Sequence, residues 1–188
     1  MEALLTSTAL VAIAEIGDKT QLLSFVLAAR LRKPLAIILG IFTATVANHA
    51  LAGSLGVWLA QLLPQNWLVW LTGLTFIAFG LWALVPDSLD GEPRAYPAGA
   101  FVTTTIAFFL AEMGDKTQLA TVALGARFDA LAAVVLGTTL GMLLANIPAV
   151  LVGEALAHKL PMRAIRYLAA LSFMVTGLVS FLGASSSA

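Results

Sequence analysis

The sequence predicts an all-α membrane protein in which six transmembrane helices form two inverted three-helix repeats. Three observations support this fold class: an apolar composition, six apolar segments long enough to cross a membrane, and a duplicated sequence pattern. Of the 188 residues, 60% are hydrophobic and 11% are charged. A soluble domain has about 25% charged residues, so this chain has too much apolar surface for one small core.

Six apolar segments reach the length of about 20 helical residues that a bilayer core requires. They cover residues 3–29, 35–63, 67–85, 98–126, 130–158 and 164–183. The first segment lacks the basic start of a signal peptide and continues through charged residues into further apolar sequence, so we expect it to be retained. Short polar or proline-containing connections separate the segments.

An internal repeat divides the chain. Residues 3–85 align without a gap on residues 100–182, with identity at 28 of 83 positions. The longest matches are AEIGDKTQL at 14–22 and AEMGDKTQL at 111–119. We therefore expect a first repeat over residues 1–85, a linker over 86–97, a second repeat over 98–183 and a tail over 184–188.

The distribution of basic residues predicts the orientation of the repeats. Three spans per repeat is an odd number, so the second repeat enters the bilayer from the opposite side. One side has seven basic residues in its connections: Arg30, Arg32, Lys33, Arg94, Lys159, Arg163 and Arg166. The other side has Arg127 alone. The positive-inside rule then places both termini outside and the central loop in the cytoplasm. Inverted repeats of this kind are typical of secondary transporters, whose sites lie near the midplane.

Three charged residues fall near the middle of the first span, and three fall near the middle of the fourth. They are Glu15, Asp18, Lys19, Glu112, Asp115 and Lys116. Each costs about 2.5–3.5 kcal/mol at a helix centre. At about 100° per residue, the charges and the following Gln21 or Gln118 share one side of a helix. Gly17 and Gly114 allow close packing or an opening of the helix. We expect the two stripes to form one pocket.

The predicted pocket has the chemistry of a divalent-cation site. Its carboxylates and amides are hard oxygen ligands, which suit Ca²⁺, Mn²⁺ or Mg²⁺. The chain has no cysteine, which excludes thiolate sites. Four carboxylates and two ammonium groups sum to −2, and clustered carboxylates without a metal should bind protons. We expect no prosthetic group, and the zero net charge gives no reason to expect a nucleic-acid partner. The oligomeric state is left open.

Both blocks resemble the Glu-x-Gly-Asp-(Lys/Arg)-(Thr/Ser) motif of the Gdt-type cation/proton exchanger family, which includes bacterial MneA-type manganese exporters and Golgi calcium/manganese exchangers. The resemblance implies exchange of Mn²⁺ or Ca²⁺ for H⁺, and the short chain favours a manganese exporter of the bacterial inner membrane. The ligands or proton carriers would be Glu15, Asp18, Glu112 and Asp115. The accessory residues of the metal or proton pathway would be Lys19, Thr20, Gln21, Lys116, Thr117 and Gln118.

Five further polar residues lie in the spans. They are Ser24, Asn48, His49, Thr121 and Asn146. The two asparagines could complete the site or bond between helices, and the two hydroxyls could extend the polar path or bond to their own backbone. His49 is expected to be a packing or proton-relay residue more than a metal ligand.

Other functions fit the sequence less well. The blocks could be internal Glu/Lys ion pairs that only hold helices together. An exporter of small organic cations or amino acids could share the architecture, and a cation channel could be lined by the same acids. An intramembrane aspartyl protease needs two unequal aspartates, whereas the two blocks here are nearly identical. We therefore do not expect an enzyme.

Overall fold

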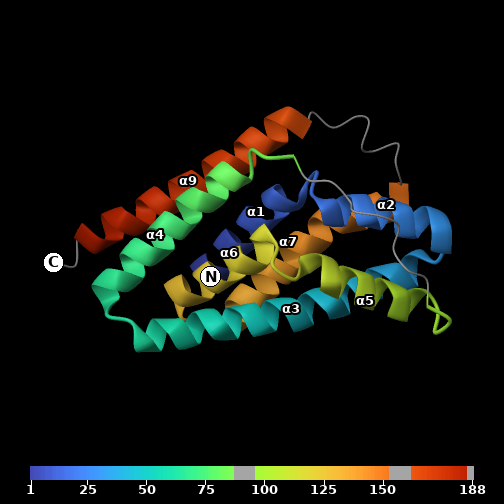
Figure 1. Cartoon of the computed structure of the whole chain (residues 1–188), viewed down its shortest axis with the longest axis horizontal. Helices are drawn as coiled ribbons and strands as arrows, with labels where there is room; N and C mark the ends of the chain where they lie inside the picture. The colour runs from blue at the N-terminus through green and yellow to red at the C-terminus, as the bar shows by residue number, and fades with distance from the viewer. Residues whose placement is uncertain (87–95, 153–161, 186–188) are drawn as a thin grey trace.

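The computed structural model describes residues 1–86, 96–152 and 162–185, and every regular element in these ranges is an α-helix (Figure 1). The helices are α1 (Glu2–Glu15), α2 (Lys19–Leu31), α3 (Pro34–Leu62), α4 (Gln65–Trp82), α5 (Ala100–Glu112), α6 (Lys116–Phe128), α7 (Leu131–Val152) and α9 (Met162–Ser185). The all-α class is therefore confirmed. Much of the expected linker, the end of the expected tail, and the basic residues Arg94 and Lys159 lie outside the described residues.

The first and fourth apolar segments are each divided into two helices. The interruptions fall at residues 16–18 and 113–115, where Gly17 has φ 85° and Gly114 has φ 76°. Side chains with a Cβ rarely adopt this left-handed backbone, so glycine allows each chain to leave the helix. The expectation that the charged block lies along one continuous helical face is wrong, because each helix ends at the motif glutamate. The alternative, an opening at the glycine, is correct.

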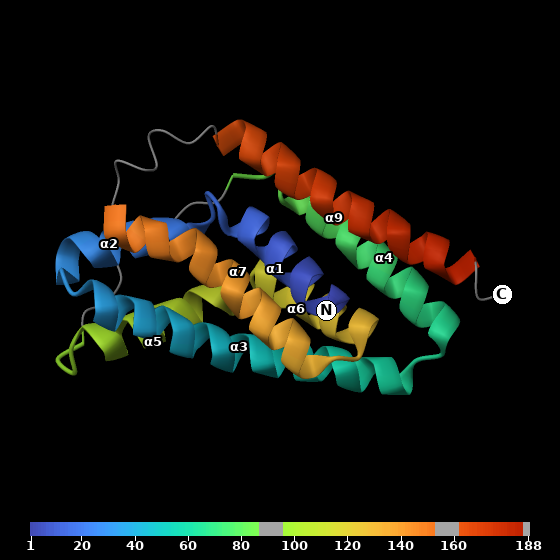
Figure 2. The same ribbon diagram turned by 180° about the vertical axis from the view of Figure 1, so that it is seen from behind.

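The divided helices pack against the other half of the chain. Helices α1 and α2 pack on α7, while α5 and α6 pack on α3. Both views show α4 and α9 side by side along one flank of the molecule (Figures 1 and 2). Close packing relies on small residues: a Cβ added to Gly56 would lie 2.0 Å from the Val122 carbonyl oxygen. Each half of the chain therefore packs its interrupted helices against the long helix of the other half.

Three described helical segments are long and apolar enough to cross a membrane: Pro34–Leu62, Leu131–Val152 and Arg163–Leu182. Their outward faces carry exposed apolar side chains, including Trp58, Leu136 and Leu178. Inside, one cluster centres on Phe76, Phe79 and Phe173 at the contact of α4 with α9, and another contains Ile41, Phe108 and Met142. These apolar contacts hold the two interrupted segments in place.

Candidate metal site

The two interruptions are built in the same way. The Asp18 N–H donates to the Glu15 carbonyl at 3.1 Å, and the Asp115 N–H donates to the Glu112 carbonyl at 3.1 Å. The backbone N–H of each glycine also has a partner: the Gly17 N–H donates to Gln21 Oε1 at 2.9 Å, and the Gly114 N–H donates to Gln118 Oε1 at 2.7 Å. The motif glutamines therefore stabilise the interruptions, a role that the sequence-based prediction did not include.

The two motif glutamates are fully buried, and each is held by the motif threonine. Thr20 Oγ1 donates to Glu15 Oε2 at 2.5 Å, and Thr117 Oγ1 donates to Glu112 Oε2 at 2.9 Å. Both carboxyl groups have 0% relative exposure. The second oxygen of each, Oε1, has no hydrogen-bond partner among the described residues. Each glutamate therefore has one anchored oxygen and one available oxygen.

The motif lysines pair with aspartates of the opposite motif. Lys19 Nζ lies 3.1 Å from Asp115 Oδ1, and Lys116 pairs with Asp18 through Oδ1. These ion pairs join the two motifs, so internal Glu/Lys pairing along one helix does not explain the blocks. The two pairs differ in exposure, because the Lys19 side chain is 27% exposed and the Lys116 side chain is 4% exposed.

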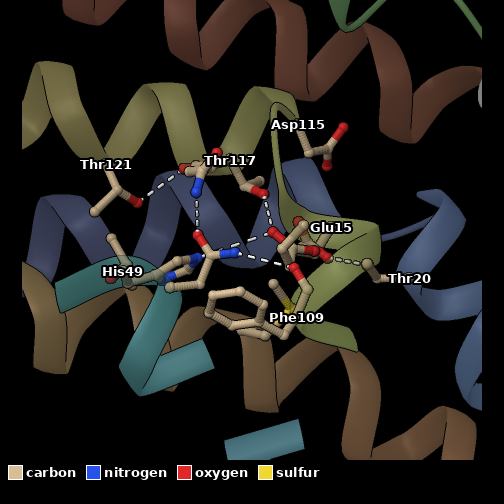
Figure 3. A network of polar contacts seen from close by, with 12 residues as sticks. Glu15, Thr20, His49, Phe109, Asp115, Thr117 and Thr121 are labelled. Carbon is tan, nitrogen blue, oxygen red and sulfur yellow. Dashed lines mark hydrogen bonds and ion pairs between the residues drawn. The ribbon is translucent and has the colours of Figure 1, made fainter. Parts of the chain in front are cut away.

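Three carboxylates converge where the motifs meet. Glu15, Glu112 and Asp115 each offer an oxygen within 4.8 Å of the other two, and all three residues are buried. Like the glutamates, Asp115 has one paired oxygen, Oδ1, and one oxygen, Oδ2, without a hydrogen-bond partner among the described residues. Figure 3 shows Glu15 in contact with Thr20, with Thr117 on α6 and Asp115 at the second interruption close by. Such a group of oxygens can bind a hard divalent cation.

Comparison with known proteins agrees with this chemistry. The family model described as divalent cation/proton antiporter GDT1 matches residues 3–91 and 100–188, which include both motifs. The chain belongs to this family. It is 52% identical to a Vibrio cholerae protein with a provisional name as a manganese exporter, over 96% of this chain and 90% of that protein. No solved structure matches the chain.

More distant GDT1 relatives match over nearly the same length. An Arabidopsis thaliana protein named GDT1-like protein 5 is 27% identical over 94% of this chain and 93% of its own length. A GDT1-like protein of Synechocystis is 26% identical over 92% of this chain and 93% of its own length. The match therefore extends over the whole helical assembly, and the GDT1 family is one of transporters.

Around the GDT1 motifs, the predicted asparagines make contacts between the halves of the chain. Gln118 Nε2 donates to Asn48 Oδ1 at 2.5 Å, and Asn48 Nδ2 donates to the Phe109 carbonyl at 3.3 Å. At the other interruption, Gln21 Nε2 donates to the Ala145 carbonyl at 3.1 Å. Ala145 and Asn48 correspond at the repeat offset of 97. Gln21 therefore donates to the backbone carbonyl of Ala145, where Gln118 donates to the side-chain oxygen of the corresponding residue, Asn48.

The two hydroxyls beyond the glutamines behave differently. Ser24 donates to Asn146 Oδ1 at 2.7 Å, which links α2 to α7. Thr121 donates to the carbonyl of Thr117 in its own helix at 2.8 Å (Figure 3). Thr121 therefore hydrogen-bonds to the backbone of its own helix, as hydroxyls in membrane helices commonly do.

Sequence reasoning did not predict the position of His49 relative to the motif. This residue is fully buried, and its Nε2 lies 3.9 Å from Glu112 Oε2. The repeat offset contained a signal, since His49 corresponds to Asn146 and the two repeats therefore differ beside the site. Contacts between α3 and α5, which sequence spacing alone does not give, bring the imidazole close to Glu112.

Proposed function

We propose that this GDT1-family chain exports Mn²⁺ in exchange for H⁺. One observation carries the proposal: three buried carboxylates converge, and each has one oxygen held by a neighbour and one without a hydrogen-bond partner among the described residues. A divalent cation would use those available oxygens of Glu15, Glu112 and Asp115. The 52% identical Vibrio cholerae relative, provisionally named for manganese export, supports Mn²⁺ as the cargo.

The charges near the site suit a doubly charged ion. Each lysine offsets one aspartate, through the Lys19–Asp115 and Lys116–Asp18 pairs. When ionised, Glu15 and Glu112 then contribute the remaining charge of −2. We propose that Asp18 belongs to the site through its pairing with Lys116 and becomes a ligand or proton carrier during the transport cycle. Protons and metal compete for the same oxygens, which couples their movements.

We further propose that the chain crosses the membrane six times. Helices α1 with α2, and α5 with α6, would each form one interrupted span, and discontinuous helices of this kind are common at transporter sites. The repeats would comprise residues 1–85 and 98–183, joined by the linker 86–97. Positive residues in the connections support termini outside and a cytoplasmic linker, and the likeness to a Vibrio cholerae protein supports a bacterial inner membrane.

Calcium is a second candidate cargo. The available donors are carboxylate oxygens, and Ca²⁺ is bound by six to eight oxygen ligands in proteins. The family description specifies a divalent cation without naming one. Manganese is preferred here because of the Vibrio cholerae relative, while Ca²⁺ and Mg²⁺ must be compared directly.

Purified protein in liposomes tests this function. Vesicles with an acidic lumen, placed in neutral buffer with Mn²⁺, should accumulate the ion, and the luminal pH should rise as protons leave. Parallel assays with Ca²⁺ and Mg²⁺ rank the cations. Mn²⁺ flux without proton movement would indicate a channel and overturn the exchange mechanism. Proton efflux driven by lysine but not by Mn²⁺ would instead indicate an organic-cation exporter.

A further inference from the structure

His49 is a buried polar side chain whose ring nitrogens are unsatisfied within the ranges that the structure describes. It lies on α3 with 0% relative exposure, and neither ring nitrogen has a hydrogen-bond partner among the described residues. A buried imidazole without hydrogen bonds is unfavourable. Its Nε2 lies 3.9 Å from Glu112 Oε2 (Figure 3), so the ring is directed toward a proposed ion ligand.

The equivalent position in the other repeat is satisfied in another way. Asn146 accepts from Ser24 at 2.7 Å and donates to the Met142 carbonyl at 3.0 Å. These bonds keep its amide at the contact of α7 with α2. At this position of the second half, an asparagine therefore fits between the helices with its amide hydrogen-bonded. The imidazole near Glu112 needs a separate explanation.

The Glu112 oxygen that lies 3.9 Å from His49 is the one that Thr117 already holds. Glu112 Oε2 already accepts from Thr117 at 2.9 Å, whereas Oε1 has no hydrogen-bond partner among the described residues. A second donor to Oε2 would fix the carboxylate plane and leave Oε1 free for the ion. Carboxylate ligands of metals are commonly held by such hydrogen bonds.

We propose that His49 is a positioning residue for the transported cation: its Nε2–H donates to Glu112 Oε2 when the ion is bound. The present distance is about 1 Å longer than an ordinary N–H···O hydrogen bond, so the proposal requires the imidazole and the carboxylate to move together by that amount when the ion binds. This inference rests on the proposed function, in which Glu112 binds the ion. It makes the two halves of the site unequal, because Glu15 has Thr20 and Glu112 has both Thr117 and His49.

Three variants of His49 in liposomes test the role, with Mn²⁺ concentration varied under a constant pH gradient. His49→Leu fills the space without a donor, His49→Asn introduces the shorter amide of the second repeat, and His49→Gln offers a longer amide that can reach Glu112. We expect KM for Mn²⁺ to rise about 10–100-fold in the Leu and Asn variants, with the maximal rate nearly unchanged. The Gln variant should recover most of the lost affinity.

A matched control is Thr72→Val, which removes a buried hydroxyl that bonds to the Leu68 carbonyl of its own helix, α4. Thermal unfolding in detergent checks that each variant is folded, and calorimetric Mn²⁺ binding gives an affinity without transport. Unchanged KM and binding in His49→Leu and His49→Asn would overturn the positioning role, as would equal impairment of the Gln and Leu variants. If vesicles containing the wild-type protein do not exchange Mn²⁺ for H⁺, the proposed function itself is refuted.

Discussion

Lys116 pairs with Asp18, and the two residues belong to motifs 97 positions apart in the chain. The reciprocal pair, Lys19 with Asp115, has an Nζ–Oδ1 distance of 3.1 Å. Each motif thus supplies a cation to the other motif's aspartate. The site exists only where both halves of the chain meet, so relative movement of the halves would change both ion pairs at once.

The first prediction concerns the unequal burial of these pairs. Lys116→Met should destabilise the protein by about 3–5 kcal/mol, because removal of one partner leaves a buried charge without its compensation. Lys19→Met also leaves a buried aspartate, Asp115, without its lysine, but it should cost less than Lys116→Met, since the Lys19 side chain is 27% exposed and water can reach this pair and screen it. Denaturant unfolding in detergent micelles measures both. Adding Asp18→Asn to Lys116→Met should restore part of the loss, and equal effects of the two lysine variants would contradict the prediction.

The second prediction concerns the converging carboxylates. Glu15→Gln or Asp115→Asn should reduce Mn²⁺ uptake into liposomes to the level of empty vesicles, because each removes a negative charge and a ligand oxygen while preserving side-chain shape. The protein should remain inserted and folded. Thr43→Val is the control, since Thr43 Oγ1 donates to its own helix at Leu39 and is exposed. Full Mn²⁺ transport by either carboxylate variant would remove that residue from the site.

The third prediction concerns the backbone of the second interruption. Gly114 has φ 76°, and a Cβ added there would meet no atom within 4 Å. Gly114→Ala should therefore lose about 1–2 kcal/mol through backbone strain alone. Gly114→Asn should lose less, since asparagine tolerates the left-handed region better than alanine. Thermal unfolding gives the order of stabilities, and equal stability of Gly114→Ala and wild type would show that the interruption does not depend on this conformation.

Much of the site could be predicted from the sequence because the chain contains the pattern twice. The duplication identified Glu15 and Glu112, and the cost of charge at mid-span indicated that they need partners or a cation. The apolar composition, together with six apolar runs long enough to span a bilayer as helices, predicted the all-α class. The convergence of Glu15, Glu112 and Asp115 follows the expectation that the two motifs meet, although no sequence spacing gives the distances.

The helix interruptions and the contacts between helices could not be predicted from the sequence, because they depend on the backbone conformation at the glycines and on tertiary packing. The helical periodicity that placed Glu15 and Asp18 on one face assumes an unbroken helix, and Gly17 allows the alternative that the chain adopts. Asp18 pairs with Lys116 and lies outside the group of three converging carboxylates. The contrast between His49 and Asn146 was visible in the repeat alignment, but its consequence required the packing of α3 against α5.

The fourth prediction concerns competition between protons and Mn²⁺. Two carboxylate oxygens with no hydrogen-bond partner in the part of the chain that the structure describes, Oε1 of Glu15 and Oε1 of Glu112, can bind a proton or contribute to a metal site, but one oxygen cannot do both at once. The apparent affinity for Mn²⁺ should therefore fall as pH falls, and Mn²⁺ binding should release protons. Calorimetry in buffers of different ionisation enthalpy measures the number released. Glu15→Gln removes one of the competing oxygens, so any residual Mn²⁺ binding in that variant should release fewer protons than in the wild type. Mn²⁺ binding to the wild type that is independent of pH and releases no protons would contradict exchange at a shared site, because coupling requires the two cations to compete for the same oxygens.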